Sequence, residues 1–218
     1  MSGPFAKTTF GPPAPGTTDT NKGALIADVQ EGVVEIVDMQ GNTHGVESTL
    51  LLLQAQTALT AINTTAQTLM SLALLAGALN KTNRTLIISG TVIFTNFANA
   101  SNQITIALKL GAVTLCTIST AASIAASVTN GQLTFCFTFS VASVGSSGTL
   151  EAHGAVVAQL STTLGTALPQ YGDQNTALSS AVNLTSALTL AVTIAEGGSG
   201  SGAIASAQLR QGQIEVVN

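Results

Sequence analysis

The stretch that decides the fold is Gln132–Phe139, QLTFCFTF, in which large apolar residues alternate strictly with polar or small ones. One set is Leu133, Phe135, Phe137 and Phe139, and the other is Gln132, Thr134, Cys136 and Thr138. Successive side chains of a β-strand point to opposite faces, so this period of two predicts a strand with one face in the core. Each large apolar side chain stabilises a fold by about 1.5–3 kcal/mol when buried. We therefore expect the four apolar side chains, Phe135 and Phe137 among them, to anchor the hydrophobic core.

The same alternation continues in two other segments. Thr85–Thr95, TLIISGTVIFT, is rich in β-branched residues, and residues 103–110, QITIALKL, alternate throughout. The side chains expected to share an inner face are Leu86, Ile88, Val92 and Phe94 in the first segment, and Ile104, Ile106, Leu108 and Leu110 in the second. Gln103, Thr105 and Lys109 are expected to point outward.

Further strands are expected where short apolar runs are bounded by Gly, Ser and Asn. They are residues 32–37, 113–119, 150–160, 186–194 and 203–217. Residues 50–80 are ambiguous, because their leucine and alanine content favours a helix whereas their threonine content favours strands at about 57–62 and 67–75. Residues 161–183 are interpreted as a long connection, and 197–202, GGSGSG, as a flexible loop.

The chain divides into an arm and a domain. Residues 1–47 hold four of the five prolines and six of the ten acidic residues. The prolines of residues 11–16, GPPAPG, favour an extended path, so residues 1–47 predict an extended N-terminal arm with one or more short strands. Residues 48–218 show about eight short strands and no alternation of strands with helices. They predict an all-β fold, a jelly-roll-like antiparallel β-sandwich.

Charged residues make up only 7% of the chain, whereas hydrophobic residues make up 45%. The net charge is −4 and the six basic residues are scattered, which disfavours nucleic acid as a partner. The longest apolar runs are far shorter than the roughly 20 residues of a membrane-spanning helix, and the start of the chain lacks the apolar core of an export signal. No charged residue occurs from Ser48 to Asn80 or from Leu110 to Leu150, which favours self-association.

Histidine and cysteine residues form no recognisable site. His44 is interpreted as a turn residue and His153 as a structural strand residue, because neither has further zinc ligands nearby in the sequence. Cys116 and Cys136 are interpreted as two buried thiols, because a chain without an export signal seldom carries a disulfide.

Catalytic motifs are not found either. The sequence contains no G-x-S-x-G elbow, and residues 197–202 lack the lysine of a phosphate-binding loop. The closest-spaced acidic residues are Asp28, Glu31, Glu35 and Asp38. Val33-Val34 and Ile36-Val37 argue against a helix there, so these acids are interpreted as a solvated face or as salt-bridge partners of a neighbour. We expect no catalytic, cofactor-binding or metal-binding residues, no cofactor, and no enzymatic activity.

Several phrases of the sequence resemble a domain that recurs in the virion proteins of tailed phages. They are residues 68–72 (TLMSL), 76–80 (AGALN), 83–90 (NRTLIISG), 104–111 (ITIALKLG), 148–154 (GTLEAHG) and 209–215 (LRQGQIE). The resemblance extends over residues 65–217 and leaves residues 1–47 outside it. It implies a jelly-roll-like fold, often trimeric, on the outside of a phage particle. It carries no active site.

Two functions follow as expectations. The first is a structural virion protein, a capsid decoration or cement protein that stabilises the head through an oligomeric β-domain and an anchoring arm. The alternative is a tail-fibre or receptor-binding module for host adsorption. Sugar-binding surfaces commonly use aromatic side chains, and this chain has one tyrosine, Tyr171, and no tryptophan. A bacterial surface or enzyme domain is the weakest reading. The expected partners are the chain itself, as a homotrimer, and the major capsid protein or another virion protein, but neither nucleic acid nor membrane. The expected location is the virion surface, after synthesis in the host cytoplasm.

Overall fold

The computed structural model describes residues 24–28, 33–37, 43–45, 48–54, 56–96, 102–120, 124–159, 169–172, 178–197 and 204–217. Of the first four ranges it describes the backbone alone. The described residues form strands and no helix. The all-β class predicted from the alternation is therefore confirmed.

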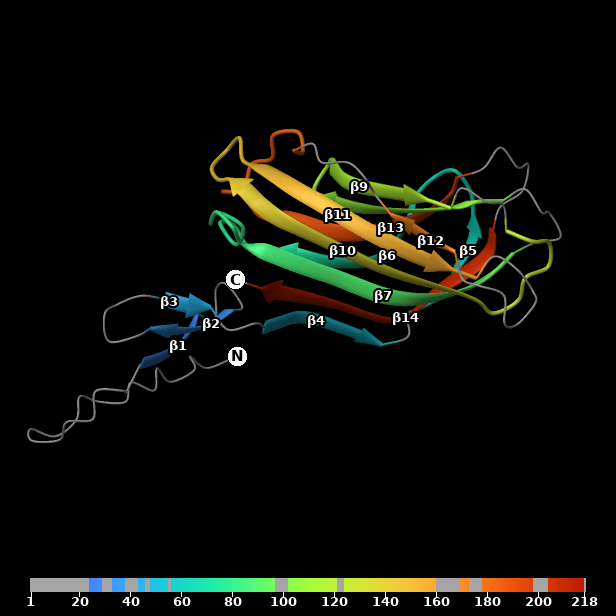
Figure 1. The fold of residues 1–218 in the computed structure, drawn as a ribbon, viewed down its shortest axis with the longest axis horizontal. Coiled ribbons are helices and arrows are strands. Elements are labelled where there is room, and N and C mark those ends of the chain that lie inside the picture. Colours follow the sequence, from blue (N-terminus) through green and yellow to red (C-terminus); the bar gives the residue numbers. More distant parts are fainter. Residues whose placement is uncertain are drawn as a thin grey trace, which may run out of the picture.

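The strands form three antiparallel sheets (Figure 1). A separate N-terminal sheet contains β1 (Ala24–Asp28), β2 (Val33–Val37) and β3 (Thr43–Gly45). The large sheet of the sandwich has the order β12-β11-β10-β7-β14-β4, and β5 also pairs with β14. Its strands are β4 (Ser48–Gln54), β5 (Leu59–Ile62), β7 (Thr85–Thr95), β10 (Gly131–Ser143), β11 (Thr149–Ala158), β12 (Gln170–Gly172) and β14 (Ile204–Val217). The small sheet has the order β6-β13-β8-β9, with β6 (Gln67–Leu74), β8 (Ile104–Leu110), β9 (Val113–Ser119) and β13 (Leu188–Glu196).

Consecutive strands cross repeatedly between the two sheets of the sandwich. The chain passes from β4 and β5 to β6, back to β7, across to β8 and β9, back to β10–β12, across to β13, and ends in β14. As a result the order β4-β14-β7-β10 in the large sheet faces the order β6-β13-β8-β9 in the small one. This interleaving is the strand order of a jelly roll, as predicted. Strands β11 and β12 extend the large sheet beyond that unit.

The hydrophobic core lies between the two sheets, and β10 runs through its centre. Phe135, Phe137 and Phe139 are fully buried, and the ring centroids of Phe135 and Phe137 lie 5.9 Å apart. The residues predicted to face inward in β7 and β8 are buried as well, whereas Thr105 and Lys109 are half-exposed. The inner faces predicted for these three strands are confirmed.

One glycine shows how closely a side chain of β10 packs against the neighbouring strand β7. Gly90 of β7 is paired with Phe135 on one side and with Gly212 of β14 on the other. A Cβ atom at Gly90 would lie only 2.6 Å from Cζ of Phe135 and 2.9 Å from the carbonyl oxygen of Gln211. The phenylalanine ring therefore occupies the space that a side chain at Gly90 would need, and glycine is required there.

The long edge strands of the sandwich contain a β-bulge and no charged residue. In β4, β6 and β9 the pairing register shifts by one residue, and the extra residues are Leu50, Leu69 and Leu115. None of these three strands contains a charged residue or a proline. The other edge strands, β5 and β12, are only four and three residues long. Bulges and short edges hinder pairing with another chain, so the sheet edges are closed without charge.

Some predicted elements differ from the observed ones. Strands were expected at about 57–62 and 67–75, and β5 and β6 lie there, but β4 was not foreseen. Its four consecutive leucines, Leu50–Leu53, have no period of two, and such a run fits a helix as well as a strand. The N-terminal sheet contains two more strands than the single one expected at residues 32–37. Strand β12 lies inside the connection predicted for residues 161–183.

His44 is not a turn residue as predicted, because it lies in β3 and is paired with Ile36 of β2. The glycine residues around it favoured a turn, but three residues suffice for a short strand when β2 supplies the pairing. Asp28 lies in β1 and Glu35 in β2, so the prediction that these acids share no helix is confirmed. Glu31, Asp38 and most of the GGSGSG segment lie outside the described residues.

Replacing Phe135 or Phe137 by alanine should lower the free energy of unfolding by about 3–5 kcal/mol, because each ring fills a fully buried site. Urea-induced unfolding followed by circular dichroism measures this change. Thr134→Ala and Thr138→Ala are the matched controls on the outer face of the same strand, and each should cost less than about 1 kcal/mol. Equal effects at inner and outer positions would show that the strand faces are assigned wrongly.

Candidate functional site

The large sheet contains seven strands, and the side chains on its outer face are arranged in rows. The register places Thr134 of β10 between Val157 of β11 and Thr91 of β7. Three further rows follow, each two residues further along β10. They are Ala155–Cys136–Ser89, His153–Thr138–Ile87 and Glu151–Ser140–Thr85. On the other side of β7, the outward residues of β14 continue these rows with Gln211, Gln213 and Glu215. The face therefore consists largely of hydroxyl, amide and small apolar groups.

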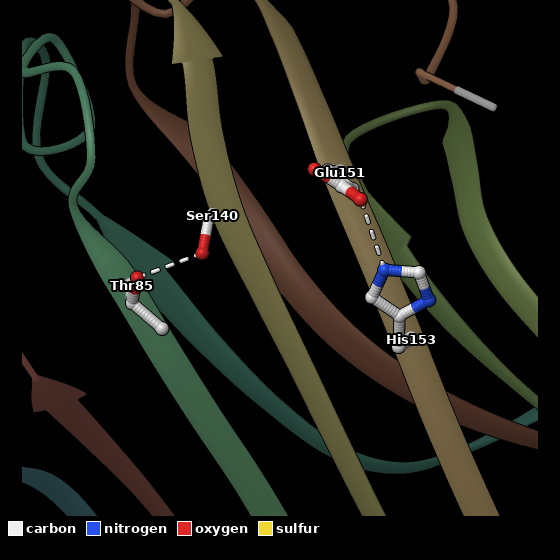
Figure 2. Close-up of polar contacts among 4 residues, drawn as sticks. All are labelled: Thr85, Ser140, Glu151 and His153. Atoms are coloured by element: carbon white, nitrogen blue, oxygen red, sulfur yellow. Dashed lines mark hydrogen bonds and ion pairs between the residues drawn. The ribbon is translucent and has the colours of Figure 1, made fainter. Parts of the chain in front are cut away.

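Two polar contacts lie at one end of this face (Figure 2). Nε2 of His153 lies 3.2 Å from Oε1 of Glu151 on the same strand, and both side chains are about half exposed. The hydroxyl oxygens of Thr85 and Ser140 lie 2.7 Å apart on neighbouring strands. An exposed pair such as His153 and Glu151 is worth at most about 1 kcal/mol, and the partly buried hydroxyl pair contributes about 0.5–1.5 kcal/mol, so both orient side chains more than they stabilise the fold.

These contacts do not form a nucleophilic pair. A catalytic serine needs a hydrogen bond to a general base such as histidine. The hydroxyl of Ser140 is bonded toward β7, through Thr85, whereas His153 lies on β11, on the opposite side of β10 (Figure 2). The histidine is engaged by Glu151. The group is therefore best described as a polar corner of a contact surface.

A shallow polar hollow lies in the middle of the same face. Its volume is about 220 Å³, and its walls are the side chains of Ser89, Thr91, Thr134, Gln211 and Gln213. Its floor is the backbone of the paired glycines Gly90 and Gly212. Hydroxyl and amide groups both donate and accept hydrogen bonds, and no charged or aromatic residue lines the hollow. Such a lining suits a small neutral polar group, and the volume is below the roughly 300–1,000 Å³ of a drug-sized pocket.

The hollow was missed by sequence reasoning, since it depends on a pairing between two distant strands. Gly90 and Gly212 meet only because β14 returns beside β7, with a register shift between Leu209 and Gln211. Glycine inside a predicted strand was the available signal, because it often marks close backbone approach or a bulge.

The structure brings together few of the residues singled out from the sequence. His153 lies in β11, as predicted, with Glu151 as its neighbour. Tyr171 of β12 is paired with the buried Val156 and packs against the core, away from the polar face. Among the described residues, no three His, Cys, Asp or Glu side chains gather closely enough to hold a metal ion. No helix in the described part of the chain has the length and apolar character needed to cross a bilayer.

The prediction that both cysteines are buried is wrong for one of them. Cys116 of β9 is buried, but Cys136 of β10 is exposed. Cys136 lies between Phe135 and Phe137, which face the core, so the period of two turns its thiol outward. Alternation decides its burial, whatever the average preference of cysteine for the interior.

Comparisons with known proteins identify no family. No protein-family model matches the chain, and a search of curated proteins gives no match. Among solved structures, the chain is similar to the CBM2 module of the evolved Dit of Lactobacillus casei BL23 phage J-1, with a TM-score of 0.29 and 10% sequence identity. The likeness covers 66% of this chain and 67% of that one. A likeness of this extent carries no functional information about this chain.

At a dilution that keeps copies of the chain apart, the thiol of Cys136 should react readily with a maleimide in the folded protein, whereas that of Cys116 should react only after unfolding. Intact-mass spectrometry should therefore find one label per chain under native conditions and two in urea. Cys136→Ser should abolish native labelling and Cys116→Ala should leave it unchanged. Native labelling that persists in Cys136→Ser would contradict the assigned facing of β10.

Proposed function

We propose that this protein is a structural component of a tailed-phage particle, a capsid decoration or cement protein that works by assembling with itself and with the shell. The observation that carries the proposal is the scarcity of charge on a rigid sandwich whose edges are closed. The sequence phrases that resemble phage virion domains, in residues 65–217, supply the kind of particle. The proposal assigns no catalytic role to any residue.

The charge scarcity concerns the surface directly. Among residues with described side chains, the charged ones are Lys81, Arg84, Lys109, Glu151, Glu196, Arg210 and Glu215. Arg84 and Glu196 are buried, so the other five charged side chains are the ones that lie on the described surface. Soluble proteins ordinarily use a far higher density of surface charge to stay apart. A surface that lacks it is suited to contact with other protein.

The contact is assigned to a sheet face, because the long edges are bulged. The large sheet's outer face carries the half-exposed apolar side chains Ile87, Ile93 and Val157 among its hydroxyl groups. Its two glutamates lie toward the end at which β10 finishes, so the rows nearer the start of β10 contain no acidic residue. The small sheet's outer face consists mainly of Thr, Ser and Ala, with Lys109 as its charged residue. Four strands of about ten residues present roughly 600 Å², which approaches the roughly 800 Å² that each partner buries in a standard interface. The large sheet's outer face is the better surface for joining copies.

A homotrimer joined through this face would act as cement by multivalent binding. Each copy would contribute modest contacts to the shell, and linkage of three copies would multiply their effect without any new contact. Residues 1–47 are proposed as the anchoring arm, with the major capsid protein as partner. The particle surface is the proposed location.

The polar hollow favours a second candidate, host adsorption by a tail-fibre or receptor-binding module. Its hydroxyl and amide lining could hold one sugar unit. However, no aromatic ring lines it for stacking, and Tyr171 packs against the core instead. The hollow alone would bind weakly, so adsorption ranks second.

Copy number per particle distinguishes the two candidates. Quantitative mass spectrometry of purified particles should find this chain in numbers comparable to those of the major capsid protein, because cement covers the whole head. A number comparable to that of tail proteins would support adsorption and reject decoration. Absence from particles would reject both.

The interface can be tested with one charge on each sheet face. Mass photometry at micromolar concentration should find a homotrimer for the unmodified chain. Thr134→Arg places an unpaired charge in the large sheet's outer face, between Val157 and Thr91, and should yield monomers, because burying an unpaired charge is costly. Thr117→Arg, on the exposed face of β9, is the matched control and should remain trimeric. A monomeric unmodified chain, or a trimer that withstands Thr134→Arg, would contradict this interface.

A further inference from the structure

Among the described residues, three large apolar side chains are exposed on the surface. They are Leu75, Val144 and Leu178, which are 59%, 42% and 54% exposed. Isolated apolar residues on a surface need no explanation, but several at one place mark an interaction site. Their position in the fold is therefore informative.

All three lie at the same end of the sandwich, the end where β10 finishes and β11 begins. Val144 lies in the connection from β10 to β11, and Leu75 directly follows β6. The last residue of β6, Leu74, is paired with the first residue of β13 at this end. Leu178 precedes Ser179, whose N–H donates to the carbonyl oxygen of Leu150 near the start of β11. This end is at the left of the sandwich in Figure 1.

The connections that carry these side chains are bonded to one another. The N–H of Gly145 donates to Oδ1 of Asn80 at 2.8 Å, which links the connection containing Val144 to the one containing Leu75. The N–H groups of Leu184 and Val182 donate to the carbonyl oxygens of Gly145 and Gly148 at 3.0 and 2.8 Å. Residues 178–187 are thereby joined to the same network.

Two further bonds fix the connection after β6. The guanidinium group of the buried Arg84 donates to the carbonyl oxygen of Ala78, and the N–H of Asn83 donates to the carbonyl oxygen of Val141. Loops held in this way lose little conformational freedom when they bind, so the three apolar side chains are presented in a fixed arrangement.

Both ends of the domain lie at this same end of the sandwich. Ser48, the first residue of β4, is paired with Val216, and Val216 is paired with Leu86 near the start of β7. Residues 1–47 therefore join the sandwich at the end that carries the three exposed apolar side chains. The segment proposed as the anchor on the shell thus leads away from this end of the domain.

We propose that this end, formed by the connections carrying Leu75, Val144 and Leu178, is the surface by which the domain docks on the shell of the particle. The partner surface is an uncharged protein surface with apolar depressions. Among the exposed residues of these connections that the structure describes, Lys81 is the one with a charged side chain, so these residues steer the contact little by charge. This inference rests on the proposed function, and it assigns the shell contact to a place distinct from the copy-to-copy face.

The test uses the full chain and capsids that lack it. The triple variant Leu75→Asn, Val144→Asn, Leu178→Asn removes the apolar side chains from exposed positions. The control variant Thr64→Asn, Ala66→Asn, Thr129→Asn places asparagine on exposed loop positions at the opposite end of the sandwich. Co-sedimentation with capsids over a concentration series gives the affinity of each, while mass photometry and urea unfolding report assembly and stability.

We expect the triple variant to keep its oligomeric state and stability but to bind capsids at least about tenfold more weakly, because contact anchors dominate such interfaces. The control variant should bind as the unmodified chain does. If the triple variant binds equally well, this inference fails and the proposed function stands. If it loses its oligomeric state, these residues join copies and the inference fails. Should the unmodified chain itself not bind capsids, both the inference and the proposed function are overturned.

Discussion

The structure depends on the packing of three phenylalanines of β10 between the two sheets. Their rings fill the centre of the core, and one of them occupies the space left by Gly90 in the adjacent strand. Phe135 is paired with Gly90, and Gly90 is paired with Gly212, so β10, β7 and β14 pack closely at this level of the sheet. On the outer face of the same three strands, the backbone of Gly90 and Gly212 forms the floor of the polar hollow. The packed ring and the hollow therefore lie on opposite faces of one level of the sheet.

The parts of the fold that sequence predicted are those with an uninterrupted period of two. Strands β7, β8 and β10 alternate strictly, and their inner faces were predicted residue by residue. Strand β4 was missed because four consecutive leucines carry no period. Cys136 could have been placed correctly by applying the alternation of its own strand instead of the average burial of cysteine. The hollow could not be located from the sequence, since its lining comes from β7, β10 and β14, and the pairing of β7 with β14 joins strands far apart in the chain.

The sandwich separates three surfaces that could serve different contacts. The large sheet presents a broad face with a polar hollow and with its glutamates toward one end. The loop end presents exposed apolar side chains on connections bonded to each other. The edges are withdrawn from pairing by bulges and short strands. Without bulges or short strands, the edges of a β-protein with so little charge would be open to pairing with another chain. Closed edges and open faces together favour defined assembly over uncontrolled aggregation.

The bulged edges also bear on how such a sequence tolerates mutation. A charge that guards an edge is lost by one substitution, whereas a bulge comes from an additional residue in the strand. At Leu50, Leu69 and Leu115 the protection of the edge therefore comes from the additional residue itself. A change of side chain at these positions does not alter the number of residues, so the register shift remains. Only a deletion would restore continuous pairing. In β6 and β9 the extra residue and the residue after it are both buried, so the side chains that follow such a deletion would keep their faces. Protection of the edge therefore depends on the number of residues in the strand, and the surface residues of that strand can change without removing it.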